Sequence, residues 1–284
     1  MIYVSSSCVN FEKIKHSVEY LVNKGIKNIE LSGGTKFYDT IVDDLIILKK
    51  KHNINFLCHN YFPPPKENFF INLASINDEI FDKSILHIKN SIKFCNLLEI
   101  KKYSFHAGFF IDPKINNKKH YFHQNFIDRD KSILRFVQAF EEIKNYNKNF
   151  GIELYLENNV ISKSNFSVFD SNFLMLTNYL EYQELKKKID FELLLDVAHL
   201  KVSCKTLNLN FVEELDKFTK LTDFFHISDN DGIEDINDEI VEGSEILRYF
   251  IQNKIIKNKT ITVEIYKPIQ FILSSIELLE RNYE

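Results

Sequence analysis

The stretch at residues 191–200, FELLLDVAHL, sets the interpretation of the whole chain. Four of its first five residues are apolar, which is too uniform for a half-exposed strand and is typical of a strand buried on both faces of a parallel sheet. Asp196 and His199 follow at the point where such a strand would end. This places a carboxylate and an imidazole at the carboxyl edge of a sheet, where α/β proteins bind their ligands.

The same order, a short apolar run followed by a longer amphipathic run, repeats along the chain. Eight strands are expected, at residues 2–6, 28–31, 55–59, 103–106, 152–157, 191–196, 223–227 and 260–265. Amphipathic runs between them predict helices, among them 11–23, 77–98 and 268–280. Dividing 284 residues by eight strands gives about 35 residues for each, close to the length of one βαβ step. The sequence therefore predicts an α/β fold with a single domain over residues 1–284, a closed (β/α)₈ TIM barrel.

Composition narrows the class of protein. Hydrophobic residues make up 44% of the chain and charged residues 27%, which is ordinary for a globular protein with a sizeable core. A net charge of −4 and only four arginines disfavour nucleic acid as a partner. The four cysteines form no CxxC pair, and the sequence shows neither a signal peptide nor a membrane span. We therefore expect a cytoplasmic protein with reduced thiols, and a homo-oligomer is compatible with these totals.

Acidic and histidine residues end seven of the expected strands. They are Glu30, His59, His106, Glu157, Asp196 with His199, His226, and Glu264. Charges gathered at one buried pole need a compensating cation. The oxygen and nitrogen donors of four of them suit Mn²⁺, Co²⁺, Zn²⁺ or Mg²⁺, namely Glu157, Asp196, His226 and Glu264. The sequence thus predicts a divalent metal site.

Several motifs, taken in their order and spacing, carry a resemblance to a known family. They are INLASIND (71–78), YSFHAGF (103–109), LENN (156–159), LLLDVAHL (193–200) and FHISDNDGIEDINDEIVEG (225–243). The chain resembles, almost end to end, the xylose-isomerase-like barrel superfamily. That superfamily contains sugar isomerases and epimerases as well as the endonuclease IV type of DNA-repair enzyme.

The resemblance implies a function and assigns roles. In the sugar enzymes one divalent ion is held by residues that correspond to Glu157, Asp196, His226 and Glu264. The resemblance also implies that Glu157 and Glu264 exchange protons with the substrate while the ion stabilises an enediolate, and that His199 contacts a substrate oxygen. We therefore expect a metal-dependent isomerase or epimerase of a sugar or sugar phosphate, acting in carbohydrate metabolism.

Three alternatives stay open. An endonuclease IV-like apurinic-site enzyme would hold three zinc ions, but Asn237 stands where those enzymes have a histidine ligand, in Asp235-Ile236-Asn237. His59 and His106 match zinc-binding histidines of the nucleases, so they are candidates for a second metal ion or for substrate. A lyase or dehydratase acting on a polyhydroxy acid would use the same site. A non-catalytic sugar-binding barrel is disfavoured because both glutamates are kept.

Further residues near the strand ends are candidates for substrate contacts. Lys201 and Lys267 follow the sixth and eighth strands and could meet a phosphate or carboxylate of the substrate. Glu30 could bind substrate or form a salt bridge at the mouth of the barrel. Four aromatic residues are candidate walls of the pocket, namely Phe62, Phe109, Phe110 and Tyr266.

Overall fold

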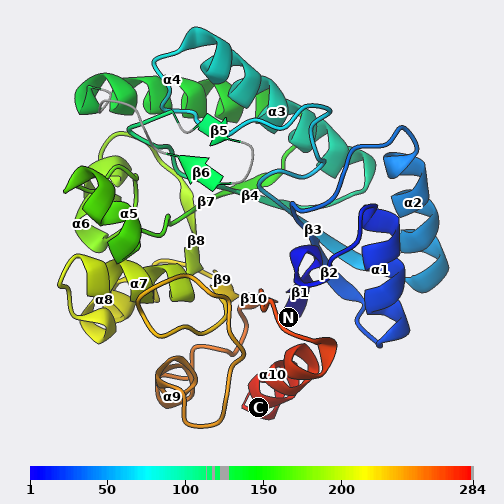
Figure 1. The fold of residues 1–284 in the computed structure, drawn as a ribbon. Coiled ribbons are helices and arrows are strands. Elements are labelled where there is room, and N and C mark those ends of the chain that lie inside the picture. The colour runs from blue at the N-terminus through cyan, green and yellow to red at the C-terminus, as the bar shows by residue number, and fades with distance from the viewer. Residues whose placement is uncertain (113, 117–118, 122–127, 283–284) are drawn as a thin grey trace.

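Eight parallel strands close into a barrel in the order β1-β10-β9-β8-β7-β4-β3-β2, with helices around it (Figure 1). The structure is a computed structural model that describes residues 1–112, 114–116, 119–121 and 128–282. It confirms the predicted (β/α)₈ TIM barrel. The face toward the viewer in Figure 1 carries the β5–β6 hairpin and the long segment after β9.

All eight expected strands are present, and each end lies within two residues of its predicted position. The barrel strands are β1 (Ile2–Ser5), β2 (Asn28–Leu31), β3 (Asn55–His59), β4 (Lys102–His106), β7 (Glu153–Glu157), β8 (Glu192–Asp196), β9 (Phe224–Ile227) and β10 (Thr260–Val263). A short antiparallel hairpin, β5 (Lys114–Asn116) with β6 (Lys119–Tyr121), is not among the eight strands that the sequence predicts.

Helices follow the barrel strands, as the alternation predicts. They are α1 (Ile14–Asn23), α2 (Ile41–His52), α3 (Asp78–Leu97), α4 (Arg129–Asn147), α5 (Lys163–Phe169), α6 (Tyr179–Lys186), α7 (Val197–Thr206), α8 (Phe211–Phe218), α9 (Glu245–Gln252) and α10 (Ile269–Arg281), with a short 3₁₀ helix η1 (Ser6–Cys8) after β1. Asn77 caps α3 by accepting hydrogen bonds from two backbone amides of its first turn. Within the part of the chain that is described, no helix has the length and apolar character needed to cross a bilayer.

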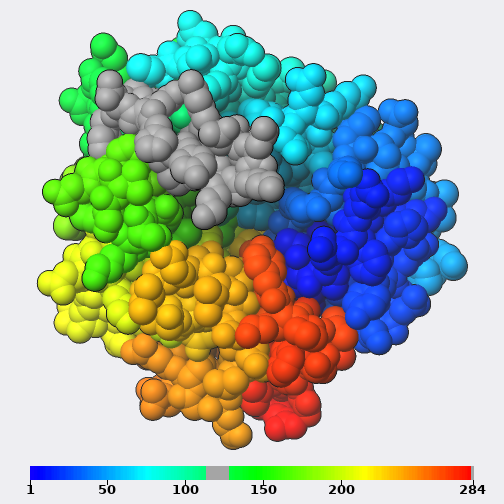
Figure 2. Space-filling view, viewed as in Figure 1, coloured from blue at the N-terminus to red at the C-terminus, as the bar shows by residue number. Residues whose placement is uncertain are grey.

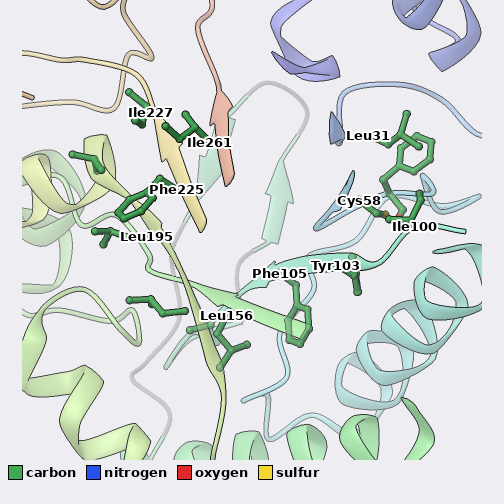
Figure 3. Close-up of a cluster of buried hydrophobic side chains, with 14 of the residues drawn as sticks. Leu31, Cys58, Ile100, Tyr103, Phe105, Leu156, Leu195, Phe225, Ile227 and Ile261 are labelled. Carbon is green, nitrogen blue, oxygen red and sulfur yellow. The ribbon is translucent and has the colours of Figure 1, made fainter. Parts of the chain in front are cut away.

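The pleat of the strands divides the core into two parts, because successive side chains point to opposite faces. Side chains on the outer face pack into the main hydrophobic cluster, between strands and helices; Figure 3 labels, among others, Leu31, Phe105, Leu156, Leu195 and Phe225. A separate buried cluster consists of the alternate residues Tyr3, Leu57, Tyr155, Leu194 and Phe224. By the same alternation, this second cluster is the apolar filling of the barrel interior.

Candidate metal centre

The predicted site residues lie one step above the apolar filling of the barrel. His59, Glu157, Asp196 and His226 each stand two residues after a member of the inner cluster, on strands β3, β7, β8 and β9. A spacing of two residues returns a side chain to the same face of a strand. The four side chains therefore point into the barrel at its carboxyl end. Glu264 follows β10 directly and joins them there.

Three of the four predicted metal ligands surround an atom of the fourth, Nδ1 of the fully buried His226. That nitrogen lies 3.4 Å from Oε1 of Glu157 and 3.3 Å from Oε2 of Glu264. Oδ2 of Asp196 is 4.0 Å away. Ligand atoms of Glu157, Asp196 and His226 all lie within 4.8 Å of one another, whereas Glu264 belongs to no such group among the described residues. The structure thus brings together carboxylates from β7, β8 and the end of β10 around one imidazole.

A second group shares Glu157. Nε2 of His59 lies 3.3 Å and Nδ1 of His106 lies 3.2 Å from Oε2 of Glu157. The other nitrogen of His59 is hydrogen-bonded to the hydroxyl of Ser104 at 2.9 Å. The candidate second-metal histidines are therefore adjacent to the first group, with the Glu157 carboxylate between the two.

The donor set fits a divalent cation. Oε2 of Glu157, Nδ1 of His106 and Nδ1 of His226 are buried and have no hydrogen-bond partner within the described residues. Buried polar atoms normally have hydrogen-bond partners. Three such atoms without a partner in one cluster are therefore suited to bind a cation. Carboxylate oxygens mixed with imidazole nitrogens suit the metals that the sequence predicts.

Without a cation, electrostatics favour the metal-binding form of Glu264 and His106 but not that of Asp196. Burial alone would raise the pKa of Glu264, but the neighbouring imidazole of His226, 3.3 Å away, lowers it to about 2. Burial lowers the pKa of His106 to about 4, against the opposing effect of Glu157. Burial raises the pKa of Asp196 to about 7, with Glu157 adding to the shift and His199 opposing it. An added cation would favour the ionised form of Asp196 because opposite charges stabilise each other.

The spacing in DVAHL has a local explanation. Asp196 is the N-cap of α7, and its Oδ1 accepts a hydrogen bond from the backbone N–H of His199 at 2.7 Å. The side-chain amide of Asn158, from the LENN motif, donates to the backbone oxygen of Asp196 at 2.9 Å and accepts from its N–H at 2.7 Å. The ends of β7 and β8 are thereby locked together, and Nε2 of His199 reaches Oδ2 of Asp235 at 3.2 Å.

A cavity of about 730 Å³ opens above the cluster, and its lining includes His59, His106, Glu157, His199 and Glu264. Its walls include the aromatic side chains of Tyr61, Phe70, Phe109, Phe173 and Tyr266. Figure 2 shows the orange segment after β9 beside the red-orange segment after β10, with the dark blue N-terminal residues next to them. These segments form part of the rim of the site.

Five of the candidate residues lie elsewhere. The ammonium of Lys201 pairs with Asp229 at 2.6 Å, and that of Lys267 pairs with Asp238 at 3.1 Å. Neither lysine lines the cavity within the described residues. Glu30 is fully buried beneath the cluster, where it pairs with His226 at 2.9 Å, which is the salt bridge that the sequence offers as its second role. Phe62 and Phe110 are buried in the main core and are not part of the cavity wall.

Two contacts at the site are not expected from the sequence. The hydroxyl of Ser7 donates to Oε1 of Glu264 at 2.8 Å, and the phenol of Tyr266 donates to the same oxygen at 2.9 Å. Ser7 lies in η1, far from Glu264 in sequence, in a run of three serines that carries no motif. The sequence predicts Tyr266 only as a wall. Together they leave Oε2 of Glu264 as the oxygen that faces His226.

The class of protein that this geometry defines is a TIM barrel in which carboxylates and imidazoles that could hold a metal ion lie at the carboxyl ends of the strands. A family model described as "Xylose isomerase-like TIM barrel" matches residues 18–277, so the chain belongs to that family. No curated protein matches it significantly.

Solved structures cover nearly the whole chain. A D-tagatose 3-epimerase-like protein is 18% identical, with 99% of this chain and 96% of that one covered and a TM-score of 0.75. Endonuclease IV from Thermus thermophilus is 12% identical, with 99% and 98% covered and a TM-score of 0.61. IOLI protein with a binding zinc atom is 15% identical, with 99% and 95% covered and a TM-score of 0.65. At these identities the likeness establishes the fold.

Proposed function

We propose that the protein is a divalent-metal-dependent isomerase or epimerase of a sugar. One observation carries the proposal. Carboxylate oxygens of Glu157, Asp196 and Glu264 gather within 3.3–4.0 Å of Nδ1 of His226, and Glu157 and Glu264 line an open cavity. In this proposal these four residues hold the cation, which would supply Lewis-acid stabilisation of negative charge on a substrate oxygen.

Glu157 and Glu264 have the second role of moving the proton. Both line the cavity, and the neighbouring imidazoles hold the pKa of each carboxyl below its usual value against the effect of burial. Both are therefore ionised at neutral pH and can accept a proton from a substrate carbon. General-base help of this kind is worth roughly a hundred- to ten-thousandfold in rate. His199, which also lines the cavity, is placed to contact a substrate oxygen.

The cavity suits a hydroxyl-rich substrate. Its aromatic walls can cover the C–H face of a sugar, while Asn60 and Asn165 in the lining offer amide groups to its hydroxyls. Lys201 and Lys267 are engaged with aspartates away from the cavity. This arrangement favours a free sugar over a sugar phosphate. The similarity of the fold to a D-tagatose 3-epimerase-like protein supports epimerisation as the reaction.

Two contacts disfavour the nuclease alternative. The buried amide of Asn237 donates to the backbone oxygen of Glu264 at 3.2 Å, and Asp235 pairs with His199. The Asp-x-Asn run that stands in place of a nuclease zinc motif is thus engaged within the protein. The lyase alternative uses the same proton abstraction and differs in the fate of the carbanion, so only the reaction product separates it.

The test is proton exchange in deuterated water. Metal-loaded protein is incubated with a panel of free ketoses and read by NMR. Deuterium incorporated at a carbon next to the carbonyl, with formation of an epimer or isomer, is the expected result. Loss of water from a polyhydroxy acid would favour the lyase. Nicking of abasic-site DNA with no exchange on any sugar would overturn the proposal.

A further inference from the structure

Glu30 on β2 is a charged side chain in a position where charge is costly. It is 0% exposed, as is the imidazole of His226. Its Oε2 accepts hydrogen bonds from Nε2 of His226 at 3.1 Å and from the hydroxyl of Thr262 at 3.2 Å. Burying a carboxylate is unfavourable unless its partners compensate it, and here the partners come from β9 and β10. The carboxylate of Glu30 therefore contacts one edge of the His226 ring, and the carboxylates of the proposed metal site contact the other edge.

The two nitrogens of His226 have different surroundings. Nε2 contacts Glu30, whereas Nδ1 faces Glu157, Asp196 and Glu264 and has no hydrogen bond to the described residues. A carboxylate only accepts hydrogen bonds, so Nε2 of His226 carries a proton that it donates to Glu30. A cation at Nδ1 would take the place of any proton there, and the metal-bound ring would be the neutral form protonated on Nε2. In the neutral ring the lone pair then sits on Nδ1. The contact with Glu30 also fixes the rotation of the ring about its side chain.

We propose that Glu30 is a positioning residue that keeps the Nε2 proton and the ring orientation of His226 so that Nδ1 is presented to a divalent cation. Glu30 is not itself a ligand in this proposal. The inference rests on the proposed metal site and adds to it a residue beneath the ligands. Carboxylates hydrogen-bonded to a ligating histidine raise its basicity, and their loss typically weakens metal binding by about 10- to 100-fold.

The test compares two buried glutamates that are replaced in the same way. Glu30→Gln keeps the size of the side chain but removes its charge. Glu214→Gln is the matched control, because Glu214 is also buried and paired, accepting from the N–H of Tyr179 at 2.8 Å and from Lys217 at 2.7 Å. The dissociation constant for Zn²⁺ is measured by competition with a chromophoric chelator, and the melting temperature of the metal-free protein is measured alongside.

We expect Glu30→Gln to weaken Zn²⁺ binding by about 10- to 100-fold at unchanged stoichiometry, and Glu214→Gln to leave it within about twofold. In zinc-loaded wild type, ¹⁵N NMR should place the His226 proton on Nε2. Equal affinity of wild type and Glu30→Gln, or zinc on Nε2, would overturn the inference while the proposed function stands. Loss of a whole equivalent of ion in Glu30→Gln would also overturn it, since Glu30 would then be a ligand.

A wild-type protein that binds no divalent cation would overturn the proposed metal site and the inference together. If Glu30→Gln does not fold, Thr262→Val keeps the test decisive, because it removes only the hydroxyl that donates to Glu30. That variant should weaken Zn²⁺ binding measurably more than Glu214→Gln does. No difference between these two variants would count against the role of Glu30.

Discussion

Replacing Gly108 by alanine should destabilise the barrel, although the same substitution at Gly33 should not. An added Cβ at Gly108 would lie 2.6 Å from Cβ of Ala74, 3.1 Å from Sδ of Met175 and 3.2 Å from the backbone nitrogen of Ala74. The methionine can move, but Ala74 is held because its N–H donates to the side chain of Asn72 at 3.1 Å. That same side chain accepts from the N–H of Phe109 at 3.0 Å, so the two loops are tied at the point of overlap.

The magnitude follows from the overlap. Forcing a methyl group into a packed contact costs about 1 to 3 kcal/mol, and replacing glycine by alanine returns about 0.4 to 1 kcal/mol through the unfolded chain. Taking the middle of each range, the net loss is about 1.3 kcal/mol, and the 2.6 Å contact with a fixed Cβ favours a value toward about 2 kcal/mol. For 284 residues, 1 kcal/mol corresponds to a shift in melting temperature of about 2 °C, so Gly108→Ala should melt about 2 to 4 °C lower.

Gly33 provides the matched control for this experiment. Its added Cβ would meet only Cβ of Tyr61, at 3.6 Å, which is ordinary van der Waals contact. Gly33→Ala should therefore melt at or about 1 to 2 °C above the wild type, because only the effect on the unfolded chain remains. Calorimetry of the three metal-free proteins gives the comparison. Equal melting temperatures for the two variants would refute the steric argument.

Three further outcomes are expected. Glu157→Gln and Glu264→Gln should each lower turnover in the deuterium-exchange assay by about a hundredfold or more without unfolding the protein, and near-normal turnover in either would remove its assigned role. A divalent cation at a hundred times its dissociation constant should stabilise the protein by about 2.7 kcal/mol, seen as a melting temperature about 5 °C higher that a chelator reverses. Burial lowers the pKa of His87 to about 4, so between pH 6.5 and pH 4 the imidazole takes up a proton in the unfolded chain but not in the folded one. The free energy of unfolding should therefore fall by about 3 kcal/mol over this range. Urea titrations at several pH values should show that His87→Phe lacks this part of the pH dependence.

The barrel was predictable because apolar residues recur with a different spacing in strands and in helices. Each parallel strand is buried on both faces, so it appears as a short apolar run, and eight such runs at regular intervals suffice for the closed sheet. Strand ends shifted by one or two residues because backbone pairing, which the side chains do not reveal, sets where a strand stops. The β5–β6 hairpin was missed because it lies in a long polar segment without alternation.

The contacts of the site were only partly predictable. Asp196 and His199 could be placed because the cap of α7 fixes them three residues apart. The contact of Ser7 with Glu264 and that of Asp235 with His199 could not be predicted. Both depend on how loops fold over the barrel, and no local sequence pattern indicates which residues such loops bring together. Asn72 shows the opposite case, because its motif reflects a structural tie between two loops and not a contact with substrate.

The two lysines differ from the acids and histidines of the strands in what fixes the position of their side chains. Side chains on strands are aimed by the pleat, so an acid or histidine two residues after an inward apolar residue has to face the barrel interior. Lys201 lies on α7 instead, with a long flexible side chain that takes the nearest compensating charge. That charge is Asp229, which follows β9, and the backbone oxygen of Asn230 accepts a second hydrogen bond at 2.6 Å. Lys201 is thereby held by Asp229 and Asn230 and does not reach the cavity. The cavity is lined instead by carboxylates and imidazoles at the ends of strands, such as His59 and Glu157.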